Sequence, residues 1–202
     1  MTRREITAAA LGVALSLVAG AVSAQTGGQG RNGDQSGLAR MLEVRAHQAL
    51  IERIGRDDAV LAPFATDGCS GGLSDVWRMV SARFPDFAAA HEDRPPWEPC
   101  CVVHDAAYHD GTGGGTAEAG YAARLQADAA LRLCVIDIGE TRKRQLAEAY
   151  DIDSATVIAG YEVIADAMYL AVRLGGAPCS GLSWRWGFGW PDCDFLTAAP
   201  PE

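Results

Sequence analysis

The 202-residue sequence predicts a mainly α-helical, exported protein built around a disulfide-linked antiparallel helix pair, with additional helices on both the N-terminal and C-terminal sides. Three observations predict this fold class. The chain begins with the pattern of an export signal, it carries six cysteines, and apolar residues recur at helical spacing in several segments. A composition of 49% hydrophobic and 21% charged residues is ordinary for one soluble globular domain.

The N-terminus has the organisation of a cleavable signal peptide. Arg3 and Arg4 precede a short apolar run that ends in Val22-Ser23-Ala24, where small residues suit a signal peptidase. We therefore expect residues 1–24 to be a signal peptide and the mature protein to be secreted or periplasmic. The alternative is an uncleaved membrane anchor.

Net charge narrows the choice of partners. The full chain carries a formal charge of −9, and removing Arg3, Arg4 and Glu5 with the signal peptide (−9 − 2 + 1) leaves −10. Such an acidic protein should not bind nucleic acid or anionic lipid surfaces through bulk charge.

The rest of the chain divides into a linker and one domain. Residues 25–37 are rich in glycine and polar side chains and are expected to be a flexible linker, so the domain should span residues 38–202. The apolar spacing of residues 38–54 predicts a helix that packs rather than functions, and residues 73–87 predict a short one. Residues 154–174 are apolar, but Glu162, Asp166 and Arg173 recur at helical spacing, so we expect a core helix and no transmembrane span after signal cleavage.

Between these segments lies the predicted helix pair. Its first helix should open at residues 97–99 and end in the glycine run of residues 111–115. The second should begin at residues 116–118 and run to about residue 136. A short glycine-rich connection favours an antiparallel arrangement.

The first helix of the pair carries the most informative residues of the chain, Cys100-Cys101-Val102-Val103-His104-Asp105-Ala106-Ala107-Tyr108. In a helix, Cys101, His104, Asp105 and Tyr108 lie at positions i, i+3, i+4 and i+7 and share one face. A titratable base beside a carboxylate that can bind a metal indicates hydrolytic chemistry.

A general-base histidine needs a second carboxylate on its far nitrogen, and Asp128 is the candidate. Adjacent helical residues point about 100° apart, so Asp105 is better placed to bind a metal than to orient His104. If Cys100 pairs with Cys134, the rise of ~1.5 Å per residue brings Asp128 near the level of His104. With that pairing, Cys101 would join Cys69, and Cys179 would join Cys193.

These residues resemble the secreted phospholipase A2 superfamily. Its active-site helix has the pattern Cys-Cys-x-x-His-Asp-x-x-Tyr, which residues 100–108 match, and its opposing helix has an aspartate six residues before a cysteine, as Asp128 and Cys134 do. Its glycine-rich calcium loop is similar to Gly68-Cys69-Ser70-Gly71-Gly72. The resemblance covers roughly residues 66–136 and implies a helix pair of phospholipase A2 type.

The resemblance also implies an activity: calcium-dependent hydrolysis of the sn-2 ester of a phospholipid substrate at a membrane surface. His104 would deprotonate the attacking water, Asp128 would orient His104, and Tyr108 would hydrogen-bond Asp128. Calcium would be held by Asp105 and the backbone carbonyls of Gly68, Ser70 and Gly72. The sequence departs from the animal enzymes at Ala107, where they have a cysteine, at Ser70, where they have a glycine, and in a longer gap between the loop and the helix.

Other interpretations of the same residues remain open. The domain could be a catalytically inactive phospholipase A2-like module that binds calcium or lipid. Gly68-Cys69-Ser70-Gly71-Gly72 also fits the Gly-x-Ser-x-Gly turn of serine esterases, although no histidine follows His109. Cys101 and His104 could form half of a zinc site. The tryptophans of the C-terminal region, Trp184, Trp186 and Trp190, could pack in the core or contact a membrane interface.

Overall fold

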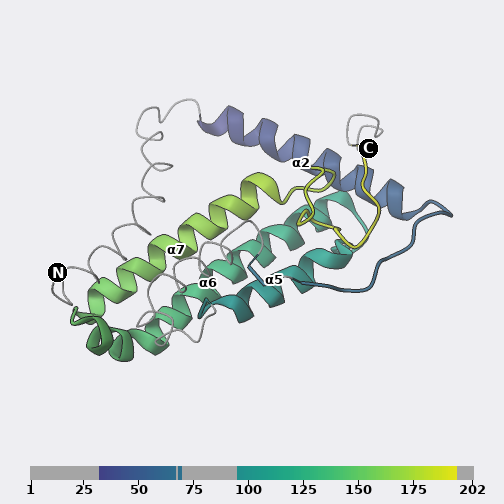
Figure 1. Ribbon diagram of the computed structural model, residues 1–202. Coiled ribbons are helices and arrows are strands. Elements are labelled where there is room, and N and C mark those ends of the chain that lie inside the picture. The colour runs from purple at the N-terminus through teal and green to yellow at the C-terminus, as the bar shows by residue number, and fades with distance from the viewer. Residues whose placement is uncertain (1–31, 67, 70–94, 195–202) are drawn as a thin grey trace.

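The computed structural model describes residues 32–66, 68–69 and 95–194 (Figure 1). This part of the chain forms four helices and no strand: α2 (Asn32–Ile54), α5 (Glu98–Asp110), α6 (Ala117–Tyr150) and α7 (Ser154–Gly175). The mainly helical class is therefore confirmed for the described residues. Helix α2 begins at Asn32, six residues before the predicted start at Leu38. The signal peptide and the short helix expected at residues 73–87 lie outside the described residues.

Helix α5, which carries the Cys100–Tyr108 segment, begins and ends where the sequence predicts. Pro99 lies in its first turn, where a missing backbone N–H costs nothing. Gly111 ends the helix with φ +58°, in the left-handed region that favours glycine. A Cβ atom on Gly111 would come within 2.5 Å of the Cα atom of Gly187, so the close approach of a later segment also requires glycine there.

Helix α6 is longer than predicted. Its start is capped by the Thr116 side chain, which accepts a hydrogen bond from the backbone N–H of Ala119. The helix continues past residue 136 to Tyr150 because nothing in between breaks it. Gly139 instead lets α6 approach the ring of Tyr161 on α7 closely, and Leu146 is buried near the end.

Helix α7 packs along α6 (Figure 1). Its start is capped by the side chain of Asp153, which accepts from the backbone N–H of Thr156 at 2.8 Å. The residues that face the core are Val157, Tyr161, Ala165 and Met168. Within the described residues, α7 is the one helix long and apolar enough to span a membrane by length and composition, a test that the core helix of a soluble protein also passes.

Helices α5 and α6 run antiparallel. Three contacts show this, because the residue numbers rise along α5 while those of their partners fall along α6. They are the Cys100–Cys134 disulfide, the His104–Asp128 contact and the hydrogen bond from Arg124 to Tyr108. Helix α6 also contacts α2 and α7, so it forms the centre of the described fold.

All six cysteines are paired, and the pairings match the expected ones. Besides the bond between α5 and α6, Cys69 joins Cys101 and Cys179 joins Cys193. Adjacent Cys100 and Cys101 point in different directions from α5, so one helix is tied both to α6 and to the segment before it. Three disulfides are compatible with an extracellular protein.

The C-terminal loop, residues 176–193, covers the end of α5. Two backbone amides and two indole N–H groups of this loop donate to four successive carbonyls at that end, at 2.7–2.9 Å. The pairs are Gly187 to Tyr108, Gly189 to His109, Trp190 to Asp110 and Trp186 to Gly111. These are the groups that a helix C-terminus otherwise leaves without an intrahelical partner. Trp186 is buried, whereas Trp184 and Trp190 are half-buried.

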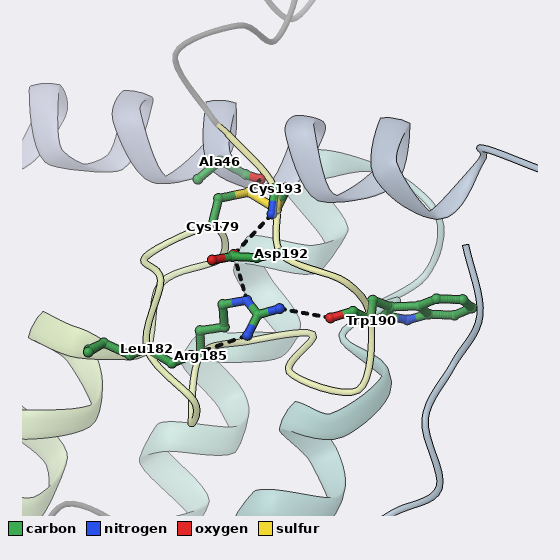
Figure 2. Close-up of a disulfide and its surroundings, with 7 residues drawn as sticks. All are labelled: Ala46, Cys179, Leu182, Arg185, Trp190, Asp192 and Cys193. Carbon is green, nitrogen blue, oxygen red and sulfur yellow. Dashed lines mark hydrogen bonds and ion pairs between the residues drawn. A yellow bond between two sulfur atoms is a disulfide. The ribbon is translucent and has the colours of Figure 1, made fainter. Parts of the chain in front are cut away.

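The C-terminal loop is closed by its own crosslinks (Figure 2). The Cys179–Cys193 disulfide joins its two ends. Inside it, the Arg185 side chain pairs with Asp192 at 2.9 Å and donates to the backbone carbonyl of Trp190 at 2.7 Å (Figure 2). Because Arg185 is buried and has these partners, the loop has a fixed shape from which to cap α5.

Candidate functional site

The centre of the candidate site is a buried histidine–aspartate pair between α5 and α6. Nε2 of His104 lies 2.9 Å from Oδ1 of Asp128. The Asp128 side chain is fully buried, and His104 is 7% exposed. The structure thus brings together the two residues that the sequence predicts as base and orienting acid.

Tyr108 joins this pair from the next turn of α5. Its hydroxyl donates to Oδ1 of Asp128 at 2.6 Å, and its ring lies 4.1 Å from the His104 ring, centroid to centroid. Trp186 of the C-terminal loop packs edge-on against the same phenol ring. Tyr108 is therefore fixed from two sides, and it fixes Asp128 in turn.

The hydrogen bonds determine which nitrogen of His104 carries the proton. Burial raises the pKa of Asp128, but hydrogen bonds from His104 and Tyr108 and the charge of Arg124 lower it by more, so the carboxylate is ionised. An ionised carboxylate can only accept, so Nε2 of His104 is the donor. In the neutral ring, Nδ1 is then the nitrogen that can accept a proton from water.

The other side of the His104 ring faces Asp105. Nδ1 of His104 is 3.9 Å from Oδ1 of Asp105, which is too long for a direct hydrogen bond. Burial lowers the pKa of His104, whereas the carboxylates of Asp105 and Asp128 raise it by more, so the pKa lies above the ordinary value. The two carboxylates therefore flank the imidazole at its two nitrogens.

Asp105 is linked to the segment that contains Gly68. The Thr66 hydroxyl donates to Oδ2 of Asp105 at 2.6 Å and accepts from the backbone N–H of Gly68 at 3.1 Å. Gly68 has φ +82°, and a Cβ atom there would lie 3.1 Å from Cγ of Glu98, so this position requires glycine. The Cys69–Cys101 disulfide holds the same segment against α5.

Of the predicted calcium ligands, two belong to the described residues. Asp105 has a carboxylate, an oxygen donor of the kind that a hard cation such as calcium prefers, and Gly68 is linked to Asp105 through the Thr66 hydroxyl. The other two predicted ligands, Ser70 and Gly72, lie outside the described residues. Among the residues that are described, no group of three or more His, Cys, Asp or Glu side chains forms a metal site; a set of one carboxylate and several carbonyls is not of that kind.

The zinc alternative is excluded because its cysteine is in a disulfide. Cys101 is bonded to Cys69, and no free cysteine is present. A zinc site with His104 would need a Cys101 thiolate, which the disulfide removes.

The sequence pattern does not indicate the charged residues that lie behind Asp128. Arg124, which is fully buried, donates from Nε to the Tyr108 hydroxyl at 2.9 Å and from a terminal nitrogen to Glu43. Arg173 donates to Oδ2 of Asp128 at 2.9 Å. Arg173 was expected in a polar stripe of α7, and Glu43 in a helix that only packs; both instead reach the site. The one available signal was the i,i+4 spacing of Arg124 and Asp128.

We expect these buried carboxylates to make the fold sensitive to acid. Burial raises the pKa of Glu43, but His47 and the two arginines lower it by more, and the pKa of Asp128 is also lowered. A group with a depressed folded-state pKa stabilises the fold above its unfolded pKa, about 4, and that contribution is lost as the pH falls through the folded pKa. The free energy of unfolding should therefore decline below about pH 4, by up to about 1.4 kcal/mol per pH unit for each group.

Urea unfolding over a pH series measures this decline. Glu43→Gln should make the acid slope shallower, whereas Asp166→Asn, which changes an exposed carboxylate, should not. An unchanged slope in Glu43→Gln would contradict the assignment.

A surface hollow of about 380 Å³ also lies between α5 and α6. Most of its lining residues are small: Ala107, Asp110, Gly113, Ala123, Gln126, Ala127, Ala130 and Trp186. None of the predicted site residues lines it, so the hollow is separate from the histidine–aspartate pair.

The geometry thus places a buried histidine and two carboxylates side by side. Comparison of this chain with protein-family models, curated proteins and solved structures found no match.

Proposed function

We propose that the protein is an exported, calcium-dependent hydrolase of phospholipase A2 type that cleaves the sn-2 fatty-acyl ester of phospholipids at a membrane surface. One observation carries the proposal: the buried His104–Asp128 hydrogen bond, with Asp105 on the opposite side of the imidazole. The resemblance of residues 66–136 to the secreted phospholipase A2 superfamily, including its helix pair, supplies the substrate class. The three disulfides support an exported protein.

The chemistry follows from the orientation of His104. With Nε2–H donated to Asp128, Nδ1 accepts a proton from water, and the water oxygen attacks the ester carbonyl carbon. The resulting imidazolium is stabilised by Asp128. When the tetrahedral intermediate breaks down, the same proton passes from Nδ1 to the leaving alcohol oxygen, which yields a fatty acid and a lysophospholipid.

Asp105 and the carbonyls of Gly68, Ser70 and Gly72 would hold calcium. When bound, the ion supplies a Lewis acid that polarises the ester carbonyl and offsets the oxyanion charge. In the chain itself, Thr66 orients the Asp105 carboxylate through the 2.6 Å hydrogen bond, and the Cys69–Cys101 disulfide holds Cys69 against α5.

The test is fatty-acid release from phosphatidylcholine vesicles by the mature protein. We expect activity with calcium, loss of activity with a chelator, and a decrease of about 10³-fold or more in His104→Gln, which removes the base. His109→Gln is a matched control, because His109 lies on the same helix and contacts the backbone carbonyl of Ala62 instead.

Three outcomes would contradict the proposal. Activity that ignores both the chelator and His104→Gln would exclude the mechanism. Calcium binding with no hydrolysis would favour the inactive binding module. Loss of activity in Ser70→Ala, with His104→Gln unaffected, would indicate a serine esterase.

A further inference from the structure

Behind the histidine–aspartate pair lies a charge cluster made of two carboxylates and two guanidinium groups: Glu43, Arg124, Asp128 and Arg173. Both arginines contact Glu43, and Arg173 also contacts Asp128. Asp128 and Arg124 are fully buried, and the side chains of Glu43 and Arg173 are 12% and 16% exposed. With two positive and two negative groups, the cluster is neutral, which is what burial of four charges requires.

Arg173 occupies a special place in this cluster because it bridges both carboxylates. One terminal nitrogen donates to Oδ2 of Asp128 at 2.9 Å, and the other donates to Oε2 of Glu43 at 2.6 Å. Arg173 lies in the last turn of α7, Glu43 on α2 and Asp128 on α6. The planar guanidinium group of Arg173 on α7 is thus bonded to α2 and to α6 at once, and it fixes the distance between those two helices.

The two arginines act on different parts of the site. Arg124 donates to the Tyr108 hydroxyl, to Glu43 and to the backbone carbonyls of Val172 and Arg173, so its bonds hold α2, α5 and α7 onto α6. Its Nε is 3.9 Å from Oδ2 of Asp128, beyond hydrogen-bond distance. Among the described contacts, Arg173 alone hydrogen-bonds that oxygen.

The two oxygens of Asp128 therefore accept hydrogen bonds from different partners. Oδ1 accepts from His104 and Tyr108, and Oδ2 accepts from Arg173. His104 and Tyr108 hold only Oδ1, and the terminal torsion of an aspartate is broad, so the bond from Arg173 to Oδ2 supplies the second point that fixes the plane of the carboxylate. If the carboxylate turns, the Nε2–H of His104 loses its acceptor, and the tautomer with the proton on Nε2 is no longer favoured.

We propose that Arg173, held by Glu43, is the positioning residue that keeps Asp128 aligned with His104 and so fixes the tautomer of the histidine. The role uses the fork of an arginine, because its two terminal nitrogens each donate to one carboxylate, whereas a lysine offers a single nitrogen on a flexible stem. Its kinetic consequence rests on the proposed function, whereas its effect on the His104 tautomer does not.

The experiment compares Arg173→Met and Arg173→Lys with Arg132→Met. Arg132 on α6 pairs with Asp166 on α7 at 2.5 Å, so the control also removes an arginine–aspartate contact between these two helices, but an exposed one. Ring nitrogen NMR shifts of ¹⁵N-labelled histidines report the tautomer, with the His104 signals identified by their absence in His104→Gln. Urea unfolding shows that each variant is folded, and vesicle hydrolysis gives kcat and KM.

In wild type and in Arg132→Met we expect the Nε2–H tautomer of His104. Arg173→Met should show a mixture of tautomers, with kcat lowered by about 10- to 100-fold and KM nearly unchanged. Arg173→Lys should be intermediate. A wild-type tautomer in Arg173→Met, with kcat no lower than in Arg132→Met, would overturn the proposal.

Two further outcomes also test the role of Arg173. If Arg173→Met does not fold, Arg173→Lys carries the test, and a wild-type tautomer with wild-type kcat in that variant would overturn the role of the fork. If wild-type protein releases no fatty acid, the proposed function fails, yet the tautomer comparison still decides the role of Arg173.

Discussion

Replacing Asp128 with asparagine is expected to lower kcat for phospholipid hydrolysis about 10⁴-fold, the scale of loss when a histidine is forced into the wrong tautomer. All the neighbours of this carboxylate donate hydrogen bonds: His104 and Tyr108 to Oδ1, and Arg173 to Oδ2. An asparagine must turn its NH₂ group toward one side. If the NH₂ faces Arg173, two donors meet; if it faces His104, the ring must accept on Nε2 and carry its proton on Nδ1.

In the second arrangement, the nitrogen that should take the proton from water is already protonated. Steady-state hydrolysis of phosphatidylcholine vesicles measures kcat, and ring nitrogen NMR shifts measure the tautomer. Asp166→Asn is the matched control, since it changes an exposed aspartate of α7. A kcat within about tenfold of wild type would mean that Asp128 does not orient the base.

Arg124→Met is expected to lower the free energy of unfolding by about 3–5 kcal/mol. The Arg124 side chain is fully buried, and its loss leaves Glu43 with one cationic partner and the carbonyls of Val172 and Arg173 without these donors. An uncompensated buried charge costs much more than an exposed one. Urea unfolding measures the difference.

Arg132→Met again provides the comparison, because its exposed pair with Asp166 should contribute no more than about 1 kcal/mol. If the free energy of unfolding fell equally in the two variants, the Arg124 contacts would stabilise the fold no more than an ordinary surface ion pair does.

Local signals in the sequence were sufficient to predict the helix pair. Pro99 and Gly111 mark the ends of α5, and both act at short range, through the missing N–H and the left-handed backbone. The spacing from Asp128 to Cys134 then sets the register of α6 against α5, which is why His104 and Asp128 could be placed at one level before their contact was known.

The charge cluster could not be predicted in the same way, because its members are distant in the sequence. Glu43 and Arg173 are 130 positions apart, and whether they meet depends on how α2 and α7 lie on α6. From the sequence alone, an arginine in the last turn of an apolar helix is equally well explained by favourable interaction with the helix dipole. Likewise, the close fit of Gly139 on α6 against Tyr161 on α7 is a contact visible only in three dimensions.

The cap that the C-terminal loop places on α5 has a consequence for the order in which the protein is completed. The indole donors of Trp186 and Trp190 lie 75 and 80 residues after the carbonyls that they satisfy. During synthesis, α5 exists long before those donors do. The turn of α5 that contains Tyr108 therefore gains its last hydrogen bonds only when the final part of the domain has been made and has folded, so this side of the site is completed last.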